Sequence, residues 1–122
     1  MATTNTKKRA QVSPHPGPLR MDQMASHAEE AAGLLKALAH PARLLVLCRL
    51  VEGEASVGEL QPMTGLSMSA LSQHLAVLRE LELVTTRRAS QSIYYAIAQS
   101  PAAGVLRALH DAYCPSEGGA KP

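Results

Sequence analysis

The chain has 122 residues, of which 46% are apolar and 18% charged, with a net charge of +2 and two cysteines. This length supports one small domain, and the lack of Phe and Trp leaves Leu, Val, Ala and Met to build its core, so we expect further burial against a second copy of the chain. The sequence has no apolar run of ~20 residues, no secretory signal and no disulfide framework, which excludes a membrane protein, a secreted scaffold and a large multidomain enzyme and favours the cytoplasm.

The two ends of the chain differ in composition from its middle. Residues 1–20 contain several prolines and the basic run Lys7-Lys8-Arg9 but almost no large apolar side chain, and residues 115–122 are rich in glycine. Segments of this kind bury too little apolar surface to fold. We therefore expect a disordered basic tail over 1–20, a folded domain over 21–114 and a flexible tail over 115–122.

Apolar residues at intervals of three and four predict two helices at the start of the domain. The stripe of the first helix, which starts at Met21, consists of Met24, Ala28, Ala31, Leu35 and Leu38. His40-Pro41 ends this helix, because the residue before a proline avoids helical dihedrals, and Pro41 suits the first turn of a second helix to about Val51. The second helix is apolar nearly all round, so we expect it at the centre of the core.

Capping residues predict the next two helices. Ser56-Val57-Gly58-Glu59 has the S-x-x-E form of a capping box and opens a short third helix to about Met63. Gly65 makes a turn, and Ser67 caps a fourth helix over 68–81 whose leucines face inward. Two short helices joined by a tight turn with glycine form a helix-turn-helix unit.

The segment that follows is rich in Val, Thr, Ile and Tyr. Leu83–Arg88 and Ser92–Ile97 predict a β-hairpin, and Ser100-Pro101 opens a last helix that ends at Cys114. The order is therefore four helices, a hairpin and one helix. We expect a winged helix-turn-helix, in the α+β class but mainly α.

The outward face of the fourth helix carries hydroxyl groups and an amide. No acidic residue occurs between Glu59 and Glu80 or between Glu82 and Asp111. Gln pairs with adenine and Ser with several base edges, so this surface favours the major groove of DNA over solvent alone.

Arginines of the hairpin add possible contacts with phosphates or the minor groove, the alternative being a solvated basic turn. For His74, beside the leucine stripe, packing inside the protein is an equal alternative. The expected DNA contacts are Ser67, Met68, Ser69, Ser72, Gln73, His74, Arg87, Arg88 and Gln91.

The two cysteines differ in their surroundings. Cys48 is in line with Leu44 and Val51, so position alone favours a buried apolar thiol, whereas Cys114 ends the last helix with His110 one turn earlier. There is no C-x-x-C or Cys/His cluster, no Ser-His-Asp order and no phosphate-binding loop. We therefore expect no metal site, no cofactor and no enzymatic activity.

The segments LKALAHPARL, SALSQHLAVLR, LVTTRR and YY resemble those of the arsenic-repressor (ArsR/SmtB) superfamily of bacterial winged-helix repressors. The resemblance covers residues 21–114. It implies a transcriptional repressor that binds double-stranded operator DNA as a symmetric homodimer, joined through the first and last helices.

Two metal-sensing patterns of that superfamily are missing. Gln61-Pro62-Met63 replaces the Cys-x-Cys of the arsenic and cadmium sensors, and the last helix offers only His110 and Asp111 in place of the zinc ligands. The chain is instead similar to the BigR, SqrR and HlyU subgroup, through Val46-Leu47-Cys48-Arg49-Leu50 and the segment Leu109–Cys114. This resemblance implies that Cys48 and Cys114 react with persulfides, and that the resulting disulfide or polysulfide bridge releases DNA.

Other functions remain open at this point. Cys48, Cys114 and His110 suggest a metal or metalloid as an alternative inducer, and general oxidants are another. From other classes of protein, a redox enzyme using the thiol pair is disfavoured by the absence of C-x-x-C, and a protein-binding winged helix would retain its partner when the DNA-facing residues are replaced.

Overall fold

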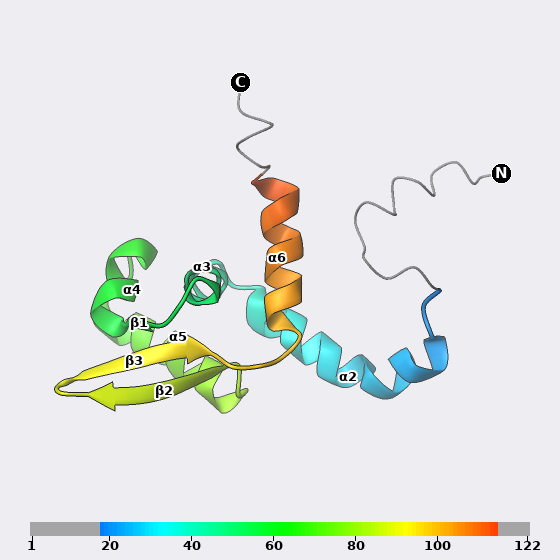
Figure 1. The fold of residues 1–122 in the computed structure, drawn as a ribbon, viewed down its shortest axis with the longest axis horizontal. Coiled ribbons are helices and arrows are strands. Elements are labelled where there is room, and N and C mark those ends of the chain that lie inside the picture. The colour runs from blue at the N-terminus through cyan, green and yellow to red at the C-terminus, as the bar shows by residue number, and fades with distance from the viewer. Residues whose placement is uncertain (1–17, 115–122) are drawn as a thin grey trace, which may run out of the picture. The chain divides into compact units, whose positions relative to one another are not determined.

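The computed structural model describes residues 18–114, which form five helices and a small sheet (Figure 1). The elements are α2 (Met21–Leu38), α3 (Pro41–Val51), β1 (Ala55–Ser56), α4 (Val57–Thr64), α5 (Met68–Glu80), β2 (Val84–Ala89), β3 (Ser92–Ile97) and α6 (Ala102–Tyr113). The predicted winged helix-turn-helix is confirmed, while the short strand β1 was not predicted. Apart from residues 18–20, the tails expected over 1–20 and 115–122 lie outside the described residues.

Residue contacts divide the chain into two units at the boundary between Ala31 and Ala32, within α2. In the first unit, residues 21–31 are the helical part that the structure describes. In the second unit, α2 ends with a buried Leu38, while Leu35 of the predicted stripe is 55% exposed. No helix within residues 18–114 is both long and apolar enough to cross a membrane.

The helix-turn-helix is held by the predicted capping residues. The backbone N–H of Glu59 donates to Ser56 Oγ at 3.2 Å, and the N–H of Ser56 donates to Glu59 Oε1 at 2.8 Å, which completes the capping box. Gly65 ends α4 with φ of 70°, a conformation that suits glycine. Ser67 then caps α5 by accepting a hydrogen bond from the N–H of Ala70 at 3.1 Å.

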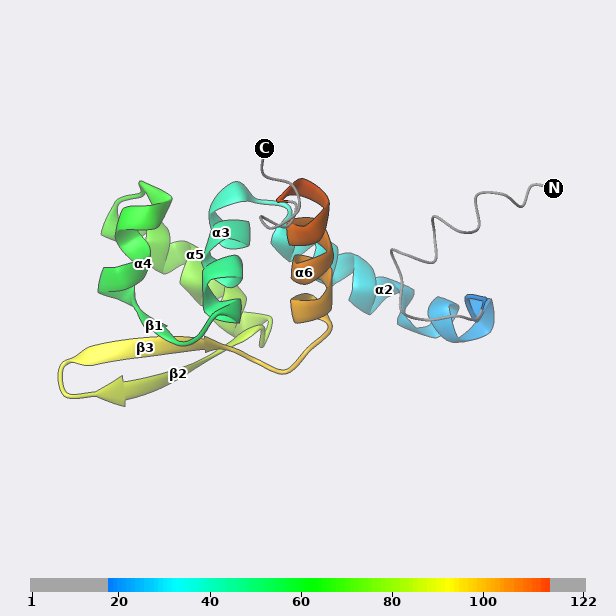
Figure 2. The same cartoon turned by 45° about the horizontal axis from the view of Figure 1, so that its top comes forward.

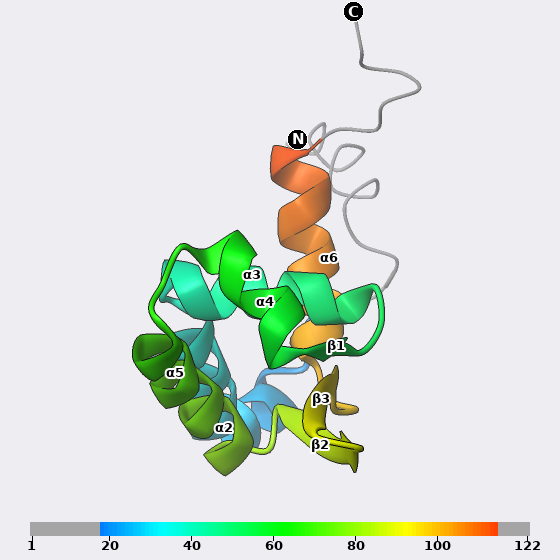
Figure 3. The ribbon, with the colours of Figure 1, turned by 90° about the vertical axis from the view of Figure 1, so that its left-hand side faces the viewer.

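The wing is a three-stranded antiparallel sheet in the order β1-β3-β2. β2 pairs with β3 from Val84 opposite Ile97 to Ala89 opposite Ser92, and Ser90 makes the turn with φ of 59°. β1 adds Ala55 opposite Tyr95, on the far side of β3. Figure 3 shows the hairpin at the lower right, with β1 above β3.

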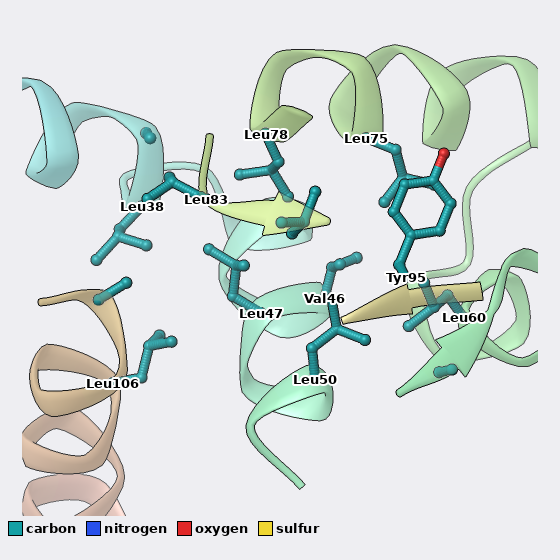
Figure 4. Close-up of a cluster of buried hydrophobic side chains, with 14 of the residues drawn as sticks. Leu38, Val46, Leu47, Leu50, Leu60, Leu75, Leu78, Leu83, Tyr95 and Leu106 are labelled. Carbon is teal, nitrogen blue, oxygen red and sulfur yellow. The ribbon is translucent and has the colours of Figure 1, made fainter. Parts of the chain in front are cut away.

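The core lies around α3, as predicted, but this helix is not buried all round. Val46, Leu47 and Leu50 point into the core, where they meet leucines of α5 and Leu106 of α6 (Figure 4). Leu45, on the outer side of α3, is 47% exposed, since no other element covers that side in the described chain. Figures 1 and 2 show α6 standing beside α3, and this arrangement positions the thiols described below.

Candidate functional site

The outward face of α5 consists of small polar side chains on a helix that is fixed from the other side. Leu71, Leu75 and Leu78 are at most 1% exposed and anchor the helix in the core. The 3.6-residue period then turns the intervening residues outward. The exposed residues of this face are Ser67, Met68, Ser69, Ser72 and Gln73, all of which were expected to contact DNA.

His74 lies half-buried between α5 and the start of α3. Its ring centroid is 4.2 Å from that of His40, and Arg43 Nη1 is 3.4 Å from His74 Nδ1. Burial lowers the pKa of His74, and positive charge on His40 and Arg43 lowers it further. Because a guanidinium only donates, Nδ1 is the acceptor and the ring is neutral. The packed alternative therefore accounts for the contacts that His74 makes in this chain.

The wing carries an ion pair that sequence reasoning missed. Arg87 Nε and Nη2 donate to Glu54 Oε2 and Oε1 at 3.0 and 2.7 Å, and the Arg87 guanidinium lies 4.8 Å from the ring centroid of Tyr94. The hydrogen bonds from Arg87 hold the pKa of the Glu54 carboxyl below its usual range, and Glu54 raises that of Arg87. The wing is thus not free of negative charge, because pairing of β1 with β3 brings this distant acid beside it.

The two arginines of the wing do not act as one cluster. Arg87 lies opposite Tyr94 and Arg88 opposite Ile93, so the two are neighbours on one strand and project from opposite faces of the hairpin. Arg88 and Gln91 are exposed. Arg87 and its ion pair with Glu54 therefore lie on one face of the hairpin, and Arg88 lies on the other.

The two cysteines lie at one site between α3 and α6. Cys48 is half-buried on α3, Cys114 is exposed at the C-terminal cap of α6, and both are free thiols. Burial raises the pKa of the Cys48 thiol, and negative charge on Cys114 and then on Glu52 raises it further. Each cysteine is therefore within electrostatic reach of the other, although position alone favoured a merely apolar role for Cys48.

A shallow depression of about 190 Å³ adjoins this thiol site. Its lining residues are Cys48, Val51, Glu52, Leu106, Arg107 and His110. Sequence reasoning singled out Cys48 and His110 here but not the charged pair Glu52 and Arg107, because they belong to no motif. Within residues 18–114, no group of three or more His, Cys, Asp and Glu side chains is arranged to hold a metal ion.

Comparisons with known proteins show which family this chain resembles. The family model for "Bacterial regulatory protein, arsR family" matches residues 40–86, from the start of α3 into β2. The biofilm growth-associated repressor of Xylella fastidiosa is 46% identical over 96 residues, which is 79% of this chain and 84% of that protein. The transcriptional activator HlyU of Vibrio cholerae is 42% identical over 97 residues, 80% of this chain and 90% of that one.

A crystal structure supports the same relationship. The transcriptional repressor BigR from Xylella fastidiosa superimposes with a TM-score of 0.75 at 44% identity, covering 80% of this chain and all of that chain. The similarity therefore extends well beyond the helix-turn-helix segment that the family model matches.

Proposed function

Because the chain belongs to the arsR family of bacterial regulatory proteins, we propose that it is a transcriptional repressor whose operator binding is ended by persulfides. The observation that carries this proposal is the position of two free thiols on neighbouring helices, Cys48 on α3 and Cys114 at the end of α6, where negative charge on Cys114 raises the pKa of Cys48. In it, a homodimer binds operator DNA when both thiols are reduced, and a bridge between them releases the DNA. A relative named as a repressor supports the proposal that DNA binding represses transcription.

The DNA-binding half of the proposal rests on the exposed face of α5 and the wing. Ser72 and Gln73 are exposed at the middle of that face, where a helix in the major groove meets base edges. Ser67 and the free N–H groups of the first turn suit a phosphate, and Arg88 on the wing suits another.

Exposed apolar side chains support a homodimer. Leu35 near the end of α2 is 55% exposed and Tyr113 at the end of α6 is 80% exposed. In a chain with a small core, such residues gain burial when a second copy covers them. Symmetric dimers read two half-sites about one helical turn apart, so a small change at a dimer helix alters the fit to DNA.

The chemistry begins at Cys114, because its thiol is exposed. Its thiolate attacks the outer sulfur of a persulfide RSSH, which forms a Cys114 persulfide and expels the thiolate of RSH. The Cys48 thiolate then attacks the inner sulfur, forming the Cys48–Cys114 disulfide and expelling hydrosulfide. In total, two protein thiols and RSSH give a disulfide, RSH and H₂S. Since the pKa of Cys48 is raised, closure accelerates as pH rises toward that pKa.

The bridge would act on DNA binding through both helices that it joins. α6 is a proposed dimer helix, and fixing its end to α3 changes where it meets the partner. α3 continues directly into Glu52, Gly53 and Glu54, and Glu54 holds Arg87 of the wing. A strain at Cys48 therefore reaches the wing over one short segment.

The test is the intact mass of reduced protein after exposure to a low-molecular-weight persulfide, with hydrogen peroxide at the same concentration in parallel. We expect the persulfide to link Cys48 and Cys114 within one chain, and operator duplexes selected with the reduced protein to dissociate at the same rate. Cys48→Ser and Cys114→Ser are the matched controls, and neither forms the bridge.

An unchanged mass, or an identical bridge formed equally fast by peroxide, would remove persulfide sensing while leaving the repressor. DNA release by a soft metal ion in the absence of any bridge would favour the metal-responsive alternative.

A further inference from the structure

The depression beside the thiols carries one cation and one anion. Arg107 comes from α6 and Glu52 from the C-terminal cap of α3. Neither forms an ion pair within 4.0 Å among residues 18–114, where the pairs include Arg87 with Glu54 and His110 with Asp111. Both side chains are exposed and line the same small space, so they are available to a ligand.

Three polar residues of α6 and its C-terminal cap share one face of the helix. Arg107, His110 and Cys114 follow one another at intervals of three and four residues, so they lie on the same side of α6. Cys114 does not line the depression itself but follows at the C-terminal cap of the same helix, while Cys48 lines it from α3. Val51 and Leu106 supply apolar lining of the same depression.

We infer that this depression receives the persulfide of a zwitterionic amino acid, with Arg107 binding its carboxylate and Glu52 its ammonium group. The inference rests on the proposed function and adds the class of inducer. Arg and carboxylate form two parallel hydrogen bonds, which fixes the orientation of a small acid. The apolar lining accommodates the methylene group that carries the sulfurs.

Size supports a single amino acid. A space of about 190 Å³ is smaller than the ~300–1,000 Å³ typical of sites for drug-sized ligands. The ligand is therefore expected to be bound by its charged head near Arg107, with the outer sulfur presented to Cys114. Transfer of that sulfur leaves the free amino-acid thiol, which then departs.

Glu52 has a second effect that the experiment must separate. Its negative charge raises the pKa of Cys48, so replacing it speeds closure with every persulfide. Recognition is therefore measured as a ratio, the rate constant for sulfur transfer from cysteine persulfide divided by that from ethyl persulfide, which is uncharged apart from its sulfur. Each persulfide is first calibrated against a small thiol in solution, which removes its intrinsic reactivity.

We expect this ratio to be about tenfold in the unmodified protein, as for one charge-assisted contact, and to approach one in Arg107→Met. Glu52→Gln lowers this ratio and, separately, raises the rate of the later closure by Cys48 with both persulfides. Arg107→Lys retains part of the preference. The control Arg79→Met, an exposed arginine in the last turn of α5, leaves the ratio unchanged.

A ratio near one in the unmodified protein, or a ratio unaffected by Arg107→Met, would overturn the inference while bridging proceeds with both persulfides. Failure of the proposed function gives a different result, since neither persulfide then forms a bridge.

Discussion

The helices α5 and α6 are of similar length but are held very differently. In α5, buried leucines at positions 71, 75 and 78 fix the helix along most of its length. In α6, the fully buried residues Ala102 and Leu106 both lie in the first half, and the last turn before Cys114 is exposed. One helix is therefore packed along most of its length beneath a polar surface, and the other is packed mainly at its start and exposed at the end that carries a thiol.

This contrast fits two tasks with different demands. A helix that meets base edges must hold several side chains in register, so its mobility lowers specificity. A thiol that must first meet a ligand and then a second thiol needs room to move. The fold meets both demands by using one core, centred on α3, and varying how far each helix is packed onto it.

Replacing a buried leucine of α5 is expected to have the strongest effect on stability. Leu75→Ala removes a side chain that is 1% exposed and is expected to destabilise the protein by about 3 kcal/mol, through lost burial and the cavity left behind. Leu81→Ala, at a position 49% exposed just beyond α5, is the control and is expected to cost under about 1 kcal/mol. Urea unfolding at one protein concentration measures both, and equal losses would contradict the contrast.

A substitution on the outer face of α5 is expected to affect DNA and not folding. Gln73→Ala should weaken operator binding by about 1–3 kcal/mol with no change in its salt dependence, since a base contact is lost and no phosphate contact. Arg88→Ala should instead reduce the salt dependence by about one phosphate contact. Fluorescence anisotropy over a salt series measures both, with Gln99→Ala, an exposed loop position, as the control.

Bridge formation is expected to slow amide exchange at the end of α6 but not in α5. Joining Cys48 to Cys114 removes the freedom of the last turn, so amide exchange at residues 110–114 is expected to slow about tenfold or more. The amides of α5 between Leu75 and Leu78 should be unaffected. Hydrogen exchange read by mass spectrometry tests this, and equal slowing in both helices would show that α6 was not selectively free.

The smallest expected effect compares one substitution in two places. Gly65→Ala places a side chain at φ of 70° in the turn before α5 and is expected to destabilise by about 1 kcal/mol. Gly104→Ala lies inside α6, where an added Cβ meets nothing within 4 Å, and is expected to stabilise by about 0.5–1 kcal/mol. Thermal unfolding gives both signs, and matching signs would contradict the assignment of Gly65 to a left-handed turn.

Local sequence signals were enough to predict most of the fold. Capping at Ser56 and Ser67, the turn at Gly65 and the leucine period of α5 are all interactions between residues a few positions apart. The strand β1 was missed because two residues carry no periodicity. The exposure of Leu45 was missed because an apolar sequence does not reveal which neighbours are present.

The candidate site was less accessible to such reasoning. The thiol pair was expected through resemblance and not from spacing, since Cys48 and Cys114 are 66 residues apart and only the packing of α6 beside α3 brings charge on Cys114 within reach of Cys48. The same holds for Glu54 and Arg87, which are 33 residues apart. Arg107 and Glu52 belong to no motif, and only the depression that they share singles them out.

The ion pair of the wing gives Arg87 a counterion within the protein, the carboxylate of Glu54. A phosphate that approaches Arg87 must compete with Glu54, which already accepts hydrogen bonds from Nε and Nη2 of that arginine. Exchanging a carboxylate for a phosphate releases fewer ions from solution than binding a bare cation does, so this contact adds little to attraction for arbitrary DNA. If the proposed function holds, the paired Arg87 would contribute little to non-specific DNA affinity, and discrimination between sites would fall to the neutral face of α5.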